Sequence, residues 1–241
     1  MHTQTNPQTR QSQEEGDQKL GHELANILTP VIGISELLMH RAGDSDDPEI
    51  SRLAKALRDS ATAARDLVQR VREIQALEHG RRTLTPRTGN LTQLLRSTVR
   101  SVADTPTAKD VRIESSYDVD DAQVEMDYDL LPRVFRAIIQ NAVEHVSSEP
   151  DLDERIVHVC LTTELGDYVV QISNPGTPVP AEKIDSFFDK FNSDRRRKPS
   201  GVGLGTTYAR LVTCAHGGRI GVRRSIEDGT VVTIALPKAI G

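Results

Sequence analysis

Gly201-Val-Gly-Leu-Gly-Thr-Thr207 is the most specific stretch of the sequence, and it leads directly into an apolar helical pattern at 206–216. Glycines let a backbone approach a ligand closely, and a helix N-terminus offers unpaired N–H groups at the positive end of its dipole. That combination suits a triphosphate. No Gly-Lys-Ser/Thr of a Walker loop follows, and the stretch does not come after a first strand as in a Rossmann fingerprint. Taken alone, it equally fits a plain tight turn.

Two other segments carry polar residues that regular structure does not explain. Arg136-Ala-Ile-Ile-Gln-Asn-Ala-Val-Glu-His145 is an apolar helical pattern that contains Asn141, a poor helix former. Its amide oxygen suits either a backbone hydrogen bond or Mg²⁺ beside phosphates. Ile172-Ser-Asn-Pro-Gly-Thr-Pro-Val-Pro180 ends a strand in an irregular turn. The amide of Asn174 can meet an adenine edge there, or simply form the turn.

A charged run precedes the glycine-rich stretch. Phe187-Phe-Asp-Lys-Phe191 is followed by Asp194-Arg-Arg-Arg-Lys198. Charged runs are usually solvated loops, but the place of this one favours a mobile lid over phosphates.

Short β-type runs alternate with amphipathic helical stretches over the whole second half of the chain. We expect one sheet covered by a helical layer, an α/β sandwich within a multi-domain α and α+β protein. The expected strands are 111–117, 122–126, 156–163, 168–173, 219–224 and 230–236, and the expected helices are 91–102, 130–146 and 206–216.

The first half has the pattern of two long helices. Apolar residues from Leu20 to Leu38 recur at spacings of three and four, and those from Ile50 to Ile74 recur close to the coiled-coil period of 3.5. A lone antiparallel hairpin cannot bury both apolar faces, so we expect a dimeric four-helix bundle. The expected organisation is a disordered tail at 1–13, a helical hairpin at 14–80, a linker at 81–88 and a nucleotide domain at 89–241.

Composition excludes several classes. The 241 residues carry a net charge of −5, and aromatic residues make up only 3%, which argues against a nucleic-acid surface. The start lacks an apolar signal core, and no apolar run approaches the ~20 residues needed to cross a bilayer. We expect a cytoplasmic protein without membrane insertion. Cys160 and Cys214 lie in apolar stretches and are expected to be buried, reduced thiols.

In this order and spacing, the segments resemble the ATP-binding domain of sensor histidine kinases, of the GHKL (Bergerat) ATPase superfamily. The resemblance covers about residues 88–237 and implies ATP and Mg²⁺ as cofactors. Asn141 matches the N-box asparagine that holds the metal, and Asn174 and Gly176 match the G1 box. The nucleotide-binding residues implied are Asn141, His145, Asn174, Gly176, Phe188, Lys190, Phe191, Gly201, Gly203, Leu204, Gly205, Thr206 and Thr230.

The chain departs from the family pattern at three positions. Asn174 stands where the G1 box usually has Asp, and Pro178 stands where it often has Gly. An amide oxygen still accepts a hydrogen bond from the adenine amino group, without the charge-assisted part of about 1 kcal/mol. Ala137 stands where the N-box usually begins with Asn or His, which affects part of the water and metal shell.

The first half resembles the dimerisation and histidine-phosphotransfer domain of the same kinases. His22-Glu-Leu-Ala-Asn-Ile-Leu-Thr-Pro30-Val-Ile-Gly33 follows the proline-containing H-box. The resemblance implies His22 as the phosphoacceptor, while Glu23 can fix its tautomer and take up its proton. Asn26 lies one turn further on the same face, where the family orients a water for dephosphorylating a partner.

The expected function is therefore an ATP-dependent protein histidine kinase. It forms a homodimer, phosphorylates His22 and passes the phosphoryl group to an aspartate of a response-regulator receiver domain, with possible phosphatase activity. The input is expected from the tail or from an upstream sensor protein. Three alternatives stay open: a phosphotransferase or pseudokinase of the same fold, a non-enzymatic dimeric scaffold, and a serine kinase of the superfamily.

Overall fold

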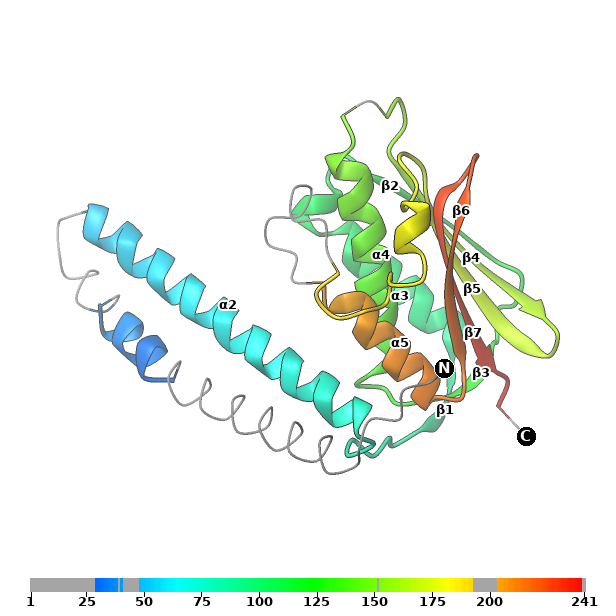
Figure 1. Ribbon diagram of the computed structural model, residues 1–241, viewed down its shortest axis with the longest axis horizontal. Coiled ribbons are helices and arrows are strands. Elements are labelled where there is room, and N and C mark those ends of the chain that lie inside the picture. The colour runs from blue at the N-terminus through cyan, green and yellow to red at the C-terminus, as the bar shows by residue number, and fades with distance from the viewer. Residues whose placement is uncertain (1–28, 39, 41–47, 151, 193–202, 240–241) are drawn as a thin grey trace. The chain divides into compact units, whose positions relative to one another are not determined.

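The chain divides into two compact units with a boundary between His79 and Gly80. The computed structural model describes residues 29–38, 40, 48–150, 152–192 and 203–239 (Figure 1). Within those ranges, no helix combines the length and the apolar character that a membrane span requires.

The first unit is helical where it is described. Residues 29–38 form one helix, and α2 runs from Pro48 to Glu78. Ala54, Ala61 and Val68 are buried at intervals of seven residues, as the coiled-coil pattern predicts. The larger side chains of Leu53 and Leu57 are 59% and 40% exposed in the single chain. The apolar face of α2 is therefore only partly covered.

The second unit contains a five-stranded sheet with the order β2-β4-β5-β7-β6. The β2–β4 pair is parallel, and every other neighbouring pair is antiparallel. A separate antiparallel pair joins β1 to β3. The bounds are β1 Arg87–Asn90, β2 Arg112–Tyr117, β3 Gln123–Met126, β4 Ile156–Glu164, β5 Asp167–Asn174, β6 Arg219–Ser225 and β7 Gly229–Pro237. Strand β1 was not expected, since it begins inside the range assigned to a linker.

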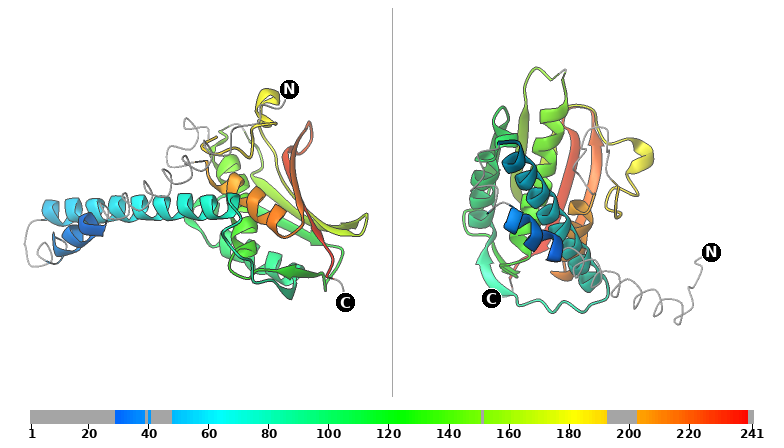
Figure 2. Two further views of the ribbon diagram at one scale, coloured as in Figure 1. Left: turned by 60° about the horizontal axis from the view of Figure 1, so that its bottom comes forward. Right: turned by 90° about the vertical axis from the view of Figure 1, so that its left-hand side faces the viewer.

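Three helices cover one face of the sheet, as Figure 2 shows: α3 (Leu91–Ala103), α4 (Leu131–Ser148) and α5 (Gly205–Ala215). Two short 3₁₀ turns, η1 (Pro106–Ala108) and η2 (Ala181–Lys183), lie in connections. Val157, Val159 and Leu161 alternate along β4 and are fully buried, because a strand points every second side chain to the same face. The expected α/β sandwich is confirmed.

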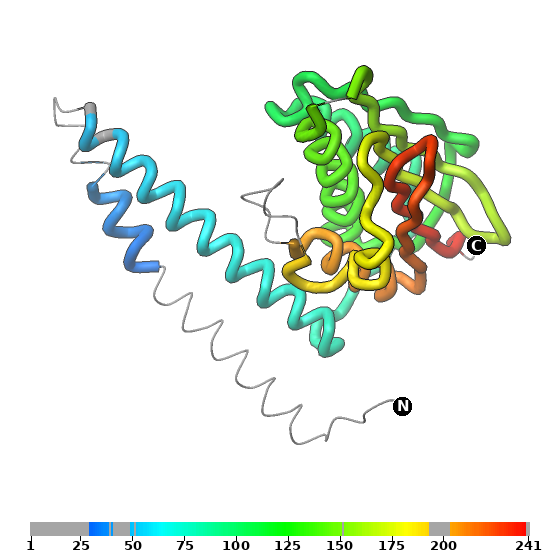
Figure 3. Tube along the Cα trace, turned by 45° about the horizontal axis from the view of Figure 1, so that its top comes forward, coloured from blue at the N-terminus to red at the C-terminus, as the bar shows by residue number. Residues whose placement is uncertain are grey.

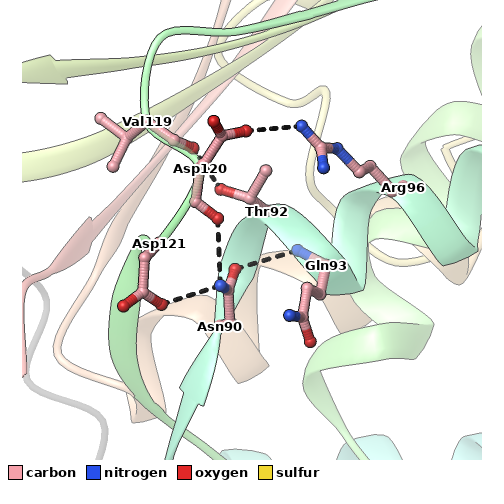
Figure 4. A network of polar contacts seen from close by, with 7 residues as sticks. All are labelled: Asn90, Thr92, Gln93, Arg96, Val119, Asp120 and Asp121. Atoms are coloured by element: carbon pink, nitrogen blue, oxygen red, sulfur yellow. Dashed lines mark hydrogen bonds and ion pairs between the residues drawn. The ribbon is translucent and has the colours of Figure 1, made fainter.

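The loop between β2 and β3 is fixed to the start of α3 (Figure 4). The Asn90 side chain accepts a hydrogen bond from the N–H of Gln93 at 3.0 Å, which caps the helix. Its Nδ2 donates to the Asp120 carbonyl and to Asp121 Oδ1 at 3.0 and 2.8 Å. Arg96 adds an ion pair of 2.7 Å with Asp120. One asparagine thus both starts the helix and holds the loop.

Helix α4 starts at a turn organised by Asp127, which is only 1% exposed. Its Oδ1 accepts the N–H groups of Asp129 and Leu130 at 2.9 and 3.2 Å, and its Oδ2 accepts the N–H of Thr85 at 3.0 Å. Burial raises the pKa of the Asp127 carboxyl, but these hydrogen bonds outweigh it and lower the pKa below its ordinary value. The ionised carboxylate therefore holds the first turn of α4 in place.

Candidate nucleotide site

A stripe of four half-buried residues runs along α4 and its C-cap. Ala137, Asn141, His145 and Glu149 follow one another at intervals of four, so they share one face of the helix. At about 1.5 Å per residue, the stripe extends over about 18 Å. A glycine turn from elsewhere in the chain contacts each of its ends.

At the Ala137 end lies the turn before α5. Gly203 has a φ of +70°, and a Cβ there would lie 2.9 Å from the backbone of Phe191 and Asn192. The N–H of Phe191 donates to the Gly203 carbonyl at 3.0 Å, and Figure 3 shows the yellow segment passing beside the start of the orange helix. A Cβ on Gly205 would lie 3.7 Å from that of Ala137. Only glycine fits this close approach at position 203.

The N-terminus of α5 has no side-chain cap among the described residues. Its N-cap residue, Leu204, makes no side-chain cap hydrogen bond. In the first turn, Thr207 is fully buried, and its Oγ1 has no hydrogen-bond partner among the described residues. First-turn N–H groups without a cap, at the positive end of a helix dipole, favour a negatively charged ligand.

At the Glu149 end lies the turn after β5. Gly176 has a φ of +100°, and a Cβ there would lie 3.2 Å from Glu149 Cγ. Thr177 Oγ1 donates to Glu149 Oε2 at 3.4 Å, and His145 Nε2 lies 3.6 Å from Glu149 Oε1. The carboxylate of Glu149 therefore ties this turn to the end of α4.

Asn174, the last residue of β5, is only 6% exposed. A β-bulge places it opposite both Gly229 and Thr230 of β7, and a Cβ on Gly229 would clash with the Asn174 carbonyl. Thr230 is also buried, and its Oγ1 accepts the N–H of Val179 at 3.0 Å. The bulge and these contacts fix the backbone that carries the Asn174 amide.

The segment expected to lie beside a lid is only partly described. Phe188 is buried and packs edge-to-face on Phe187, with ring centroids 5.0 Å apart. Phe191 is 59% exposed with a φ of +62°, and Lys190 is exposed. Asn192 Nδ2 donates to the Ser186 carbonyl at 2.6 Å, which closes this segment on itself.

The structure places most of the predicted nucleotide-binding residues at the two ends of the α4 stripe or along it. Asn141 and His145 belong to the stripe, Gly203, Leu204, Gly205 and Thr206 lie at one end, and Asn174, Gly176 and Thr230 lie at the other. The charged run 194–198 and the residues His22, Glu23, Asn26 and Gly201 fall outside the described residues.

Two expectations need additions or corrections. Sequence reasoning missed Glu149, although its spacing of four from His145 was a usable signal, and it missed the role of Asp127. The prediction that both cysteines are buried is wrong. Cys160 is half-buried and Cys214 is exposed, because it faces away from the sheet on α5.

Comparisons with known proteins agree with this fold. Residues 126–240 match the family model of the histidine kinase-, DNA gyrase B- and HSP90-like ATPases. The chain is similar to the circadian input-output histidine kinase CikA of Synechococcus elongatus, with 24% identity over 91% of this chain and 29% of that protein. It is also similar to the sensor histidine kinase CusS of Escherichia coli, with 27% identity over 95% of this chain and 46% of the relative.

Solved structures support the fold alone. Full-length ShkA in complex with AMPPNP superposes with a TM-score of 0.77 and 20% identity, over 94% of this chain and 46% of that one. The catalytic domain of histidine kinase ThkA gives a TM-score of 0.55 and 23% identity, over 64% of this chain. The chain spans less than half the length of CikA and CusS. Together, the family model matched by residues 126–240 and the curated relatives show that the chain is similar to sensor histidine kinases.

Proposed function

We propose that the protein is an ATP-dependent histidine kinase that phosphorylates His22 and passes the phosphoryl group to an aspartate of a response-regulator receiver domain. One observation carries the proposal: the α4 stripe joins a glycine turn at a helix N-terminus to a second glycine turn beside a buried amide. A nucleoside triphosphate has matching ends, an anionic phosphate chain and a base with hydrogen-bonding edges.

The residues present fit ATP in this orientation. The N-terminus of α5, which has no side-chain cap at Leu204, suits the phosphates. The Thr207 hydroxyl, which has no hydrogen-bond partner among the described residues, lies in the same turn. The Asn174 amide suits the base, because it is buried and its only hydrogen bond to a described residue is long, 3.5 Å to the Pro175 carbonyl. Asn141 and His145 line the helix face between these two ends.

Asn141 is the residue that would hold Mg²⁺. It lies one turn from Ala137 on the stripe, and no cluster of three or more His, Cys, Asp or Glu suited to a metal occurs among the described residues. A single amide oxygen suits Mg²⁺, since this ion is usually shared between one or two protein oxygens, substrate phosphates and water. When bound, the ion neutralises the charge that develops on the phosphates.

The transfer uses the chemistry of the H-box residues. A neutral ring nitrogen of His22 attacks the γ-phosphorus as the bond to the bridging oxygen breaks and ADP leaves, while Glu23 takes the proton from the other ring nitrogen. Asn26 would position a water for the reverse task, removal of a phosphoryl group from the partner aspartate. A homodimer through the helical hairpin would cover the exposed apolar residues of α2.

A labelling experiment tests the proposal. The purified chain is incubated with γ-labelled ATP and Mg²⁺ beside His22→Ala and a matched control, His40→Ala, which removes another histidine of the same unit. Acid-labile, base-stable label is expected on the wild type and on His40→Ala and absent from His22→Ala. Label that remains on His22→Ala would overturn the assignment of the phosphoacceptor.

A second candidate is a phosphotransferase with an inactive nucleotide domain. Ala137 and Asn174 favour it, because each replaces a side chain with greater hydrogen-bonding or charge capacity in the family pattern. In that case the chain takes no label from ATP but accepts a phosphoryl group on His22 from a phosphorylated receiver domain. The same assay, supplemented with phosphorylated receiver, separates the two functions.

A further inference from the structure

The backbone of Asn174 is held firmly, but its side-chain amide makes only one long hydrogen bond to a described residue. Its backbone is fixed by the β-bulge opposite Gly229 and Thr230, and the residue is 6% exposed. Its Nδ2 lies 3.5 Å from the Pro175 carbonyl, at the outer limit for a hydrogen bond. Rotating the terminal amide by 180° would therefore cost little in lost hydrogen bonding.

Such an amide can pair with two kinds of purine. The 6-amino edge of adenine presents a donor beside an acceptor, and a 6-oxopurine such as guanine or hypoxanthine presents an acceptor beside a donor. An asparagine side chain carries both a donor and an acceptor, and a half-turn exchanges them. An ionised carboxylate at this position only accepts, so it would face the purine O6 with a second acceptor.

Resting on the proposed ATP site, we propose that Asn174 determines base selection and lets the site accept 6-oxopurine nucleoside triphosphates alongside ATP. The neighbouring Thr230 does not impose a choice, because its hydroxyl already accepts the Val179 N–H and can rotate its own proton. The Glu149 carboxylate is engaged by Thr177 and lies beside His145. Among these three described side chains, the Asn174 amide is the one whose hydrogen bond to a described residue is long, so it can still pair with a base.

Equilibrium binding to the full chain tests this directly. Isothermal titration calorimetry with Mg²⁺ and either ATP or inosine triphosphate should give dissociation constants within about tenfold of one another, since each base makes neutral hydrogen bonds to the same amide. Inosine triphosphate is the chosen ligand because it carries the 6-oxo edge without the additional amino group of guanine.

Two variants sharpen the test. Asn174→Asp should weaken the binding of inosine triphosphate relative to that of ATP by more than about tenfold, because the carboxylate and the purine O6 are both hydrogen-bond acceptors. Gln171→Glu is the matched control. It makes the same amide-to-carboxylate change on the same strand, but an odd offset of three residues places it on the opposite face of the sheet. The ratio of the two constants should be unchanged in the control.

The outcomes separate this proposal from the proposed function. Binding of ATP with inosine triphosphate more than about tenfold weaker in the wild type overturns base tolerance and leaves the ATP site intact. A ratio that Asn174→Asp leaves unchanged overturns the role of Asn174. Failure of both nucleotides to bind overturns the ATP site and, with it, this inference. The wild-type measurement decides whether the site tolerates a 6-oxopurine even if the variant fails to fold.

Discussion

The backbone N–H of Asp127 donates a hydrogen bond of 2.9 Å to His216 Nε2, and this bond joins residues 89 positions apart. The other ring nitrogen of His216 lies 2.8 Å from the Val212 carbonyl, within α5. Since Nε2 must accept and Nδ1 must donate, this geometry assigns the neutral ring with its proton on Nδ1. The start of α4 and the end of α5 are thereby tied together through one imidazole.

Replacing His216 should destabilise the second unit. His216→Ala leaves the buried N–H of Asp127 without an acceptor, which costs about 1–3 kcal/mol. His216→Gln carries both an acceptor and a donor and should recover part of that loss. Urea unfolding of both variants measures it, and equal stabilities for the two would contradict the role of the hydrogen bond.

The stability of the protein in acid should depend on Asp127. Its pKa is lower in the folded protein than in the unfolded chain, so its contribution is complete above the ordinary carboxyl pKa of about 4 and is lost as the pH falls below that value. Asp127→Asn should be less stable at neutral pH, and its urea midpoint should fall less than that of the wild type between about pH 4 and pH 2. Asp129→Asn, which alters an exposed neighbour, is the control and should follow the wild type.

A methyl group at Gly203 should block the phosphate end of the site. Gly203→Ala places a Cβ against the backbone of Phe191 and Asn192, so the turn must shift and ATP affinity should fall by at least about tenfold. Gly166→Ala has a similarly positive φ of +91° but meets nothing within 4 Å. Calorimetric titration should find ATP affinity unchanged in that control, and an equal loss in both variants would point to backbone strain alone.

Removing the amide of Asn141 should abolish the effect of Mg²⁺ on nucleotide binding. Asn141→Ala should bind ATP with the same affinity in Mg²⁺ as in EDTA, whereas the wild type should bind more tightly in Mg²⁺. Gln140→Ala, at the adjacent position, should retain the dependence on metal. A metal effect that persists in Asn141→Ala would exclude this residue as the ligand.

Local pattern was enough to predict most of the second unit. The alternation of Val157, Val159 and Leu161 predicts β4 with the correct first residue, because the two-residue period of the side chains agrees with their burial. Helix α5 was expected one residue late, since a glycine such as Gly205 is rarely assigned to a helix. Strand β1 was missed because Arg87–Asn90 has no alternating pattern, and its pairing with β3 is supplied by tertiary structure.

The connections that hold the site together were harder to predict. Asp127 and His216 meet across 89 positions, and nothing in the local sequence of either residue specifies the other. Cys214 lies in an apolar stretch, yet it faces outward, because a stretch as short as 211–215 does not define which helix face is buried. By contrast, the candidate nucleotide residues were predicted as separate motifs, and the α4 stripe connects several of them in the fold.

The Thr85–Asp127 hydrogen bonds have a mechanical consequence. Thr85 lies five residues beyond the start of the second unit, and both its N–H and its hydroxyl are held by the Asp127 carboxylate. A force that pulls on the chain before Thr85 would act on these hydrogen bonds before it reached any strand of the five-stranded sheet. The force would reach the first turn of α4 and, through His216, the last turn of α5. These are the ends of the two helices that lie away from the proposed phosphate site.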